Sequence, residues 1–365
     1  MKVSPLSSLF LCGFLCLARL GGEPLWIAGE GGVYRVELDD ESGRLSEPVL
    51  ACAYNSGSYL AIHPELDVLY SSYADEEGAG YASFKPSGDG RSLELQSVQR
   101  VASGTAHLAV SANGRFLAGA HYSEGVNYVL ELEADGSISN RIKRLAQEGS
   151  GPKRPQRQAR PHWVSFAGGD SLLHSVDLGT DEIWTYAVGD AAESVVLKHK
   201  VKFPLGTGPR HMALPEQGGV AYVSGELNLV VNSLFYDATS GRFSPLQYVS
   251  AVNAEDQVEN SNLSEIQRHK SGRFVYTAVR GLNRIVAFSV DPETGLLQRI
   301  ESEDARVNWP RNFTISDSGK WLIVAGQHSG EVRVFAIDPE SGELDPVDTR
   351  IEIGNPVCVR AWGRL

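Results

Sequence analysis

One short phrase recurs along the chain and constrains its fold more than any other feature. Its clearest copies are residues 114–120 (GRFLAGA), 272–278 (GRFVYTA) and 319–325 (GKWLIVA). Weaker copies bring the hydrophobic centres to residues 69, 117, 173, 222, 275 and 322, which lie 48, 56, 49, 53 and 47 residues apart. A turn glycine, a basic residue and a short apolar run are typical of a buried inner strand that follows a tight turn. A period of about 50 residues predicts an array of small sheets.

A second pattern follows each of these predicted strands. An alternating run ends in Asp, and a turn that contains Gly then leads to Leu or Phe, as in residues 33–45, 233–243, 285–297 and 332–344. Such alternation between turn residues is typical of antiparallel strands joined by hairpins. The Asp side chain can accept backbone N–H groups of its own turn, and Gly can adopt a positive φ.

These units predict an all-β fold, a seven-bladed β-propeller with four-stranded antiparallel blades. Units of this length match propeller blades better than solenoid coils. Residues 25–28 begin a seventh unit, and residues 356–362 form a last strand that has no blade of its own. Pairing of this last strand with the first unit would close the ring and remove the exposed sheet edges. We expect residues 23–365 to form this single domain.

The first 22 residues predict an export signal. Residues 6–17 are apolar apart from Ser7, Ser8 and Gly13, and they are too few to span a bilayer comfortably. We therefore expect a periplasmic or secreted protein, or a cytoplasmic one if this segment is not a functional signal. The net charge of −12 argues against nucleic acid as a partner. We also expect a monomer that does not associate with a membrane once the signal is removed.

Two cysteines, Cys52 and Cys358, remain after the predicted signal. In an exported chain they could form a disulfide, and two buried free thiols in neighbouring terminal strands are the alternative. The sequence contains no CxxC motif and no Cys/His spacing that is typical of a metal site. We expect neither a metal nor another cofactor.

Polar residues at the ends of the predicted inner strands are the candidates for function. His107, His162, Arg210, Glu265 and Arg311 precede copies of the repeated phrase, and two further candidates, Glu226 and Arg280, follow copies of it. His211 is expected inside a blade, because Met212 and Leu214 continue into an apolar strand. No role is predicted for the remaining histidines, such as His63, His174 and His269.

Several of these segments resemble the bacterial lactonase family with a seven-bladed propeller. That family includes the propeller-type 6-phosphogluconolactonases and is similar to the carboxymuconate cyclases. The segments are residues 149–162, 176–181, 208–211, 225–227, 265–266, 279–281 and 310–313, and the whole resemblance covers about residues 25–362. It implies a catalytic set of His162, Arg210, Glu226 and Arg280. Arg160 and Val279 depart from the family pattern, in which His and Asn are usual.

The chemistry of these residue types fits the opening of a lactone, which is a cyclic ester. His162 can take a proton from water, and Arg210 and Arg280 can stabilise an oxyanion or bind an anionic group. Glu226 could orient a neighbour or act as an acid or base, and His107, Glu265 and Arg311 would line the substrate pocket. We predict a carboxylic ester hydrolase of the 6-phosphogluconolactonase type that acts on a small lactone or anionic sugar-acid derivative. The alternatives are a muconate-type cycloisomerase at the same site and a non-catalytic binding platform.

Overall fold

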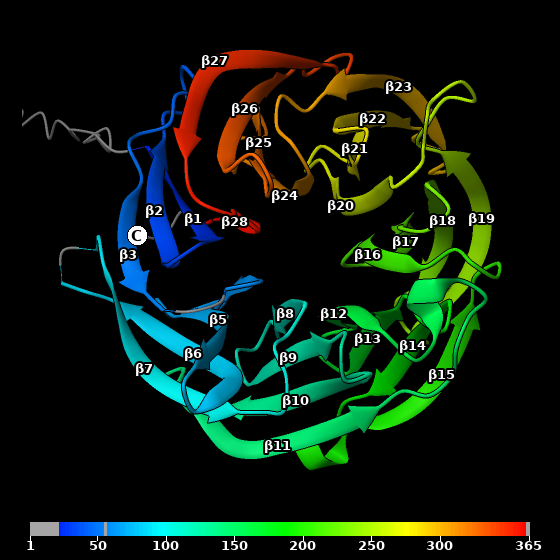
Figure 1. Cartoon of the computed structure of the whole chain (residues 1–365). Coiled ribbons are helices and arrows are strands. Elements are labelled where there is room, and N and C mark those ends of the chain that lie inside the picture. The colour runs from blue at the N-terminus through cyan, green and yellow to red at the C-terminus, as the bar shows by residue number, and fades with distance from the viewer. Residues whose placement is uncertain (1–21, 55–56, 89, 363–365) are drawn as a thin grey trace, which may run out of the picture.

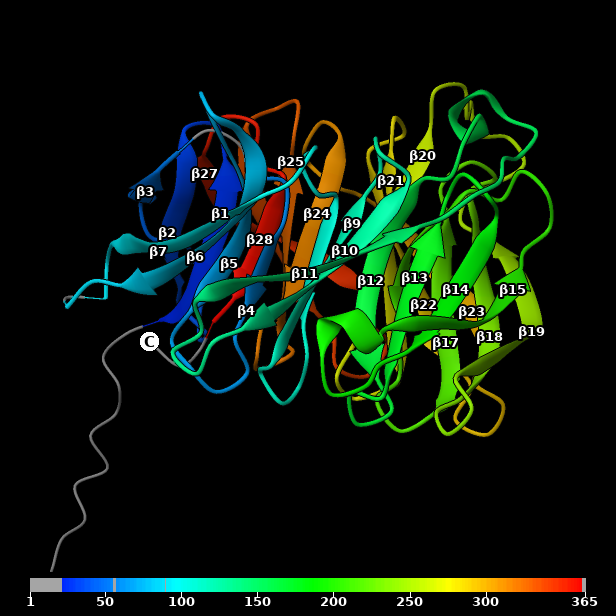
Figure 2. The ribbon, with the colours of Figure 1, turned by 90° about the horizontal axis from the view of Figure 1, so that it is seen from below.

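Seven four-stranded sheets stand around a central axis (Figure 1) in the computed structural model, which describes residues 22–54, 57–88 and 90–362. Figure 2 shows the same ring from its side. The prediction of an all-β, seven-bladed propeller is confirmed. The helical elements of the described chain are two short 3-10 turns, Arg154–Gln156 and Ala192–Ser194. No helix in these ranges has the length and apolar character that crossing a bilayer requires.

The blades are named here in chain order, each from its innermost to its outermost strand. Blades 1 and 2 are β28 (Cys358–Ala361), β1 (Glu23–Gly29), β2 (Gly32–Leu38), β3 (Val49–Ala53), and β4 (Leu60–Ile62), β5 (Leu69–Asp75), β6 (Gly78–Pro86), β7 (Leu93–Arg100). Blades 3 and 4 are β8 (His107–Val110), β9 (Phe116–His121), β10 (Val126–Leu132), β11 (Ile138–Ala146), and β12 (Pro161–Ala167), β13 (Leu172–Asp177), β14 (Glu182–Ala187), β15 (Val196–Lys202).

The remaining three blades repeat this order. Blade 5 is β16 (Pro209–Ala213), β17 (Gly219–Gly225), β18 (Val230–Asp237), β19 (Arg242–Ser250). Blade 6 is β20 (Asn262–Arg268), β21 (Phe274–Arg280), β22 (Arg284–Val290), β23 (Leu297–Asp304). Blade 7 is β24 (Pro310–Ile315), β25 (Trp321–Gly326), β26 (Glu331–Ile337), β27 (Leu344–Glu352).

The last strand of the chain closes the ring, as predicted. β28 pairs antiparallel with β1, with Val359 opposite Ile27 and Arg360 opposite Trp26. The rings of Trp26 and Trp362 pack beside this pair, with centroids 5.5 Å apart. Blade 1 therefore combines three strands from the beginning of the chain with one from its end. Residues 1–21 of the predicted signal peptide lie outside the described residues.

The repeated phrase forms the second strand of a blade rather than the innermost one. Its clear copies are β9, β21 and β25, and every residue of these strands is buried. A second strand has neighbouring blades on both of its faces, which accounts for a continuous apolar run. The innermost strands that precede them, β8, β20 and β24, carry polar side chains such as His107, Glu265 and Arg311. The prediction placed the repeated phrase on the innermost strand, one strand too close to the channel, because the channel-lining strands lack a continuous apolar run.

The hairpin turns have the predicted chemistry. In the turn at Asp291, Oδ1 accepts the backbone N–H groups of Glu293 and Thr294 at 3.1 and 2.8 Å, and Gly295 has a φ of 70°. The corresponding turns begin at Asp39, Asp237 and Asp338 and end in Gly43, Gly241 and Gly342, all with positive φ. These turns set the register of the outer hairpins.

Two histidines with no predicted function join neighbouring blades. His63 Nε2 of blade 2 lies 3.2 Å from the carbonyl oxygen of Gly114 in blade 3. His269 Nε2 of blade 6 lies 2.8 Å from the carbonyl oxygen of Gly319 in blade 7. Both glycines begin copies of the repeated phrase, so these contacts link successive units of the array.

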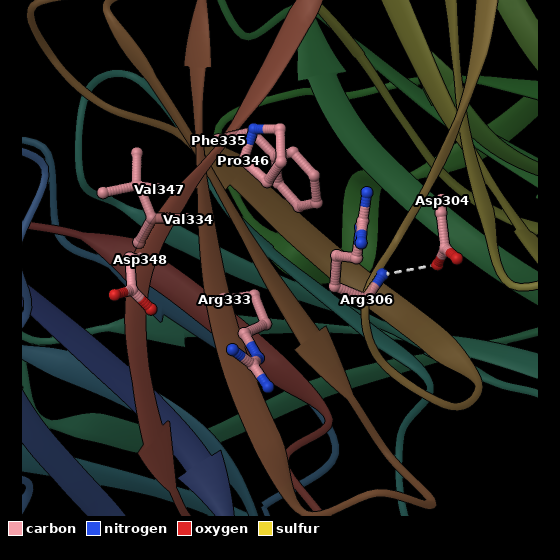
Figure 3. Close-up of a pocket in the computed structure, with 8 residues that line it drawn as sticks. All are labelled: Asp304, Arg306, Arg333, Val334, Phe335, Pro346, Val347 and Asp348. Atoms are coloured by element: carbon pink, nitrogen blue, oxygen red, sulfur yellow. Dashed lines mark hydrogen bonds between the residues drawn. The ribbon is translucent and has the colours of Figure 1, made fainter.

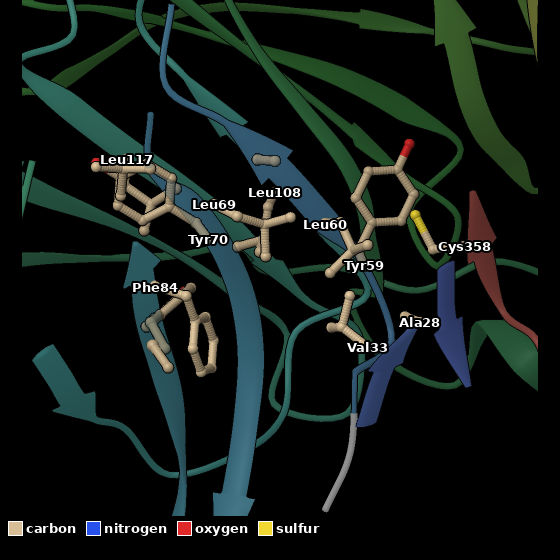
Figure 4. Close-up of a cluster of buried hydrophobic side chains, with 14 of the residues drawn as sticks. Ala28, Val33, Tyr59, Leu60, Leu69, Tyr70, Phe84, Leu108, Leu117 and Cys358 are labelled. Atoms are coloured by element: carbon tan, nitrogen blue, oxygen red, sulfur yellow. The ribbon is translucent and has the colours of Figure 1, made fainter. Parts of the chain in front are cut away.

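Hydrophobic side chains fill the space between blades, and one such cluster contains Cys358 (Figure 4). Cys52 is half-buried on β3 and packs against the edge of the same cluster. β1 and β2 separate β28 from β3, so the two cysteines are three inter-strand steps apart, about 14 Å at roughly 4.8 Å a step. A disulfide cannot span this distance. The two cysteines do not lie on neighbouring strands, and the alternative of two free thiols is the correct one.

Candidate active site at the channel mouth

Five of the seven predicted site residues meet at one mouth of the central channel. His162, Arg210 and Arg311 are each the second residue of an innermost strand, in β12, β16 and β24. Glu226 directly follows β17, and Arg280 ends β21. Because the first two strands of a blade are antiparallel, the start of one and the end of the next lie at the same mouth.

Glu226 lies between two buried arginines. Its Oε2 is 3.0 Å from Arg210 Nε, and its Oε1 is 3.1 Å from Arg280 Nη2. The side chains of Arg210, Arg280 and Glu226 are only 3%, 7% and 15% exposed. Arg280 also lies over the ring of Trp309, 5.3 Å from its centroid. With Arg311 nearby, three guanidinium groups face one carboxylate, so the mouth keeps a positive charge.

Several donors of this cluster have no hydrogen-bond partner within the described chain. Although Arg210 Nε lies close to Glu226 Oε2, its N–H is not directed at the oxygen, and both atoms are left without a hydrogen bond, as is Arg210 Nη1. Burial and the neighbouring Arg280 lower the pKa of Arg210, and the same two causes lower that of Arg311. Buried donors are almost always satisfied in proteins. The cluster is therefore suited to receive the oxygen atoms of an anionic ligand.

His162 stands beside the arginines as a buried, neutral imidazole. Its ring makes edge contacts with Tyr122 and His211, at centroid distances of 5.5 and 5.2 Å. Burial and the charge of Arg210 hold the pKa of His162 well below its ordinary range. A neutral imidazole can accept a proton from water, which is the role that the sequence predicts for it.

The other two predicted residues, His107 and Glu265, lie one layer deeper in the channel. His107 packs against Tyr59 at a centroid distance of 4.1 Å, and Arg360 donates a hydrogen bond to the Tyr59 hydroxyl. Glu265 Oε1 lies 3.2 Å from His211 Nδ1. Tyr59, His107, Glu265 and Arg360 also line a cavity of about 360 Å³ together with residues near the far ends of β12, β16 and β20. The predicted pocket-lining set is thus divided between two layers.

Three channel residues were missed or misplaced by the sequence analysis, namely His211, Tyr59 and Arg360. The prediction that His211 lies inside a blade is wrong, because its ring is 5.2 Å from that of His107 in blade 3 and from that of His162 in blade 4. The pairing of β16 with β17 shifts register between Pro209 and Met212. A β-bulge at this place interrupts the strict alternation of side chains. Consecutive residues Arg210 and His211 can therefore both reach the channel.

Two aspartates accept hydrogen bonds from the loops that lead to His162 and Arg210. Asp177 Oδ1 accepts the backbone N–H of Arg160 at 2.7 Å, just before β12. Asp181 accepts the backbone N–H groups of Gly206 and Gly208 before β16, each at 2.7 Å. Asp181 also accepts the side-chain amide of Gln156 at 2.7 Å, which ties down the loop before His162. The segment 176–181 thus positions both catalytic candidates from behind.

An Asp181→Ala variant is expected to lose about 3 kcal/mol of unfolding free energy. The substitution leaves the buried backbone N–H groups of Gly206 and Gly208 without an acceptor, at roughly 1–3 kcal/mol each before relaxation, and removes one of the two hydrogen bonds of the Gln156 amide nitrogen. Chemical denaturation followed by tryptophan fluorescence measures the loss. Asp338→Ala is the matched control, since Asp338 also accepts backbone N–H groups but is exposed to water. Equal losses in the two variants would contradict the anchoring role of Asp181.

Another hollow, of about 400 Å³, lies away from the channel on the outer strands of blades 6 and 7 (Figure 3). Its wall includes Asp304, whose Oδ1 accepts the backbone N–H of Arg306 at 2.8 Å, and Arg333 of β26. None of the predicted site residues lines it. Within the described residues, no group of three or more His, Cys, Asp or Glu side chains has the arrangement of a metal site.

Known proteins resemble this chain in sequence and in fold. The family described as "Lactonase, 7-bladed beta-propeller" matches residues 25–361. The 6-phosphogluconolactonase of Bacillus subtilis is 33% identical over 335 residues, which are 91% of this chain and 95% of that protein. A protein of the same name from Formosa agariphila is 29% identical over 312 residues, or 82% of this chain and 87% of the relative. The solved structure of a periplasmic gluconolactonase from Pseudomonas aeruginosa has a TM-score of 0.86 and 26% identity, and the match covers 93% of this chain and 99% of that one.

These findings confirm the resemblance noted in the sequence motifs and the prediction of a lactonase-type carboxylic ester hydrolase. The family match spans all seven blades. The candidate residues at the mouth come from blades 4 to 7, and His107 comes from blade 3. The chain is therefore a member of the lactonase family with a seven-bladed β-propeller.

Proposed function

We propose that the protein hydrolyses a sugar-derived lactone of the 6-phosphogluconolactone type at the channel mouth. The observation that carries the proposal is the buried group of Arg210, Arg280 and Arg311 around the single carboxylate of Glu226, with the neutral imidazole of His162 beside it. The names of the Bacillus and Pseudomonas relatives, a 6-phosphogluconolactonase and a gluconolactonase, support the same class of substrate.

Each part of the cluster has a task in the proposed reaction. The arginines stabilise the negative oxygen that forms when water attacks the lactone carbonyl, and they would also bind the phosphate group of a phosphorylated lactone. A channel imidazole accepts the proton of that water, and His162 is the residue for which the sequence pattern argues. Glu226 keeps the two guanidinium groups at a fixed spacing and partly neutralises them. No metal or other cofactor takes part in this scheme.

The proposed location narrows the range of possible substrates. We propose that residues 1–22 are an export signal and that the mature protein works as a monomer in the periplasm, in line with the periplasmic gluconolactonase that it resembles. Phosphorylated sugar lactones are cytoplasmic metabolites. An exported enzyme would therefore meet free aldonolactones rather than their phosphate esters. Sequencing of the mature N-terminus tests the location directly.

The expected result of an assay is hydrolysis of glucono-1,5-lactone, of its 6-phosphate, or of both, at a rate well above the spontaneous one. His162→Asn should lower kcat/KM by about 100-fold or more, because loss of one polar group positioned against the reacting atoms typically costs about 10²–10³. The acid released by ring opening is followed with a pH indicator. A folded protein that hydrolyses neither lactone, or that instead converts carboxymuconate to a lactone, would contradict the proposal.

A further inference from the structure

A buried carboxylate–imidazole pair lies one layer below the mouth. Glu265 Oε1 is 3.2 Å from His211 Nδ1, and the two side chains are only 5% and 2% exposed. Glu265 is held in turn by the side-chain amide of Asn312 and by the backbone N–H of Ile266 at 3.2 Å. Asn312 Oδ1 accepts the backbone N–H of Val359 at 2.8 Å. These contacts from blades 6, 7 and 1 fix the carboxylate, and the carboxylate fixes the imidazole of blade 5.

The contact with Glu265 decides which nitrogen of His211 carries the hydrogen. Burial raises the pKa of Glu265, and the charges of Arg360 and Arg210 lower it. In its ionised form the carboxylate only accepts hydrogen bonds, so Nδ1 donates to it and Nε2 keeps its lone pair. Nε2 is buried and has no hydrogen-bond partner among the described residues. Because the rings of His162 and His107 both lie 5.2 Å from the ring of His211, the imidazole stands between the two layers of the channel. An unpartnered buried acceptor marks a place where a water or ligand atom can bind.

The charges around the two imidazoles differ. His162 forms no ion pair with a described carboxylate, and Arg210 is the strongest charged influence that lowers its pKa. Burial and Arg210 also hold the pKa of His211 well below its ordinary value, so both rings are neutral at rest. His211, however, has a carboxylate 3.2 Å from its Nδ1. A buried carboxylate in this position orients the ring and stabilises the imidazolium that forms during proton transfer.

We infer that His211 is the proton acceptor of the hydrolysis and that Glu265 is its positioning residue. The inference rests on the proposed function and names the imidazole that performs its proton transfer. His211 Nε2 takes a proton from the water as the water oxygen bonds to the carbonyl carbon. When the ring C–O bond breaks, Nε2–H returns this proton to the departing alkoxide, and His211 is neutral again. His162 then hydrogen-bonds the water or the ring oxygen from the mouth side.

Kinetics of three variants on glucono-1,5-lactone and its 6-phosphate test the inference. Glu265→Gln keeps the shape of the side chain and should lower kcat by about 100-fold with KM within about threefold, and His211→Asn should lower kcat by about 10³-fold. His174→Asn is the matched control, since His174 is equally buried but lies between blades 4 and 5. It should keep the kcat of the wild type. If His211→Asn does not fold, Glu265→Gln carries the test.

A spectroscopic measurement separates this inference from the proposed function. In ¹⁵N-histidine NMR spectra of the full protein, His211 should be the Nδ1–H tautomer, and Glu265→Gln should weaken this preference, because an amide can donate to Nδ1 as well as accept from it. An active wild type whose kcat is unchanged by Glu265→Gln and His211→Asn would overturn the inference alone. A wild type that hydrolyses neither lactone would defeat the proposed function. In that case an Nε2–H tautomer of His211 would also overturn its pairing with Glu265.

Discussion

A Glu226→Ala variant will unfold with about 3–5 kcal/mol less free energy than the wild type and will lose most of its lactonase activity. The substitution removes the one carboxylate that contacts both Arg210 and Arg280, whose side chains are 3% and 7% exposed. Removing one partner of a buried ion pair leaves a charge without compensation, and the cost is of this size. The two like charges then repel each other at the place where the substrate should bind. Denaturation curves and the lactone assay measure the two losses.

Added anions give this prediction a second readout. Phosphate or sulfate should raise the melting temperature of Glu226→Ala more than that of the wild type, because the unpaired guanidinium groups become an anion site. Glu331→Ala is the matched control. Glu331 also lies between two arginines, 3.4 Å from Arg333 and 3.0 Å from Arg350, but on the outer strands of blade 7. The Glu331 side chain is 18% exposed, but Arg333 and Arg350 are 25% and 57% exposed and stay in contact with water when the carboxylate is lost, so the expected cost is about 1 kcal/mol or less. A similar loss in both variants would show that the burial of the Glu226 cluster is unimportant.

A chain that ends after Asn355 will lose cooperative folding or melt at least 10 °C lower. This truncation removes β28, whose four residues pair with β1. It also removes the backbone donor of Val359 to Asn312 and the contact of Trp362 with Trp26. The exposed edge of β1 becomes a site for pairing with other chains, so aggregation should accompany the loss. Thermal unfolding followed by circular dichroism measures the effect.

The control for this truncation is a chain that ends after Trp362 and keeps all of β28. It should melt like the full-length protein. A synthetic peptide of residues 356–362 should partly restore the shorter chain, because a strand added to a free sheet edge regains its backbone hydrogen bonds. An unchanged melting temperature in the chain that ends after Asn355 would mean that the ring does not depend on its closing strand.

The sequence was sufficient for the fold because its repeat is carried by the most buried strands. β9, β21 and β25 have neighbours on both faces, so their apolar runs are long enough to be counted along the chain. The closing strand could be predicted from the same count. Six units are complete in the sequence, the seventh unit at the beginning lacks a strand, and the unassigned last strand supplies it. The sequence alone could not distinguish two free thiols from a disulfide, because it does not show how many strands separate Cys52 from Cys358.

The candidate site could be predicted only in part. His162, Arg210, Glu226 and Arg280 were found from their positions beside the repeats and from the motifs, and the structure brings them together, although their roles remain proposals. His211 was misplaced because Met212 and Leu214 after it indicated a regular apolar strand, and a single bulge in β16 changes the direction of its side chain. The channel-lining ends of β12, β20 and β24 have similar register shifts. Irregular pairing of this kind leaves no periodic trace in a sequence.

The position of β28 beside β1 means that the described chain begins and ends in the same sheet. Proteins with adjacent ends tolerate circular permutation well. Joining the ends and opening the chain between β19 and β20 would give a propeller in which each blade is built from one continuous segment. Its ring would then be closed by packing between blades 5 and 6 alone. In the natural order, one strand, β28, both completes blade 1 and closes the ring. The permutant would separate these two effects.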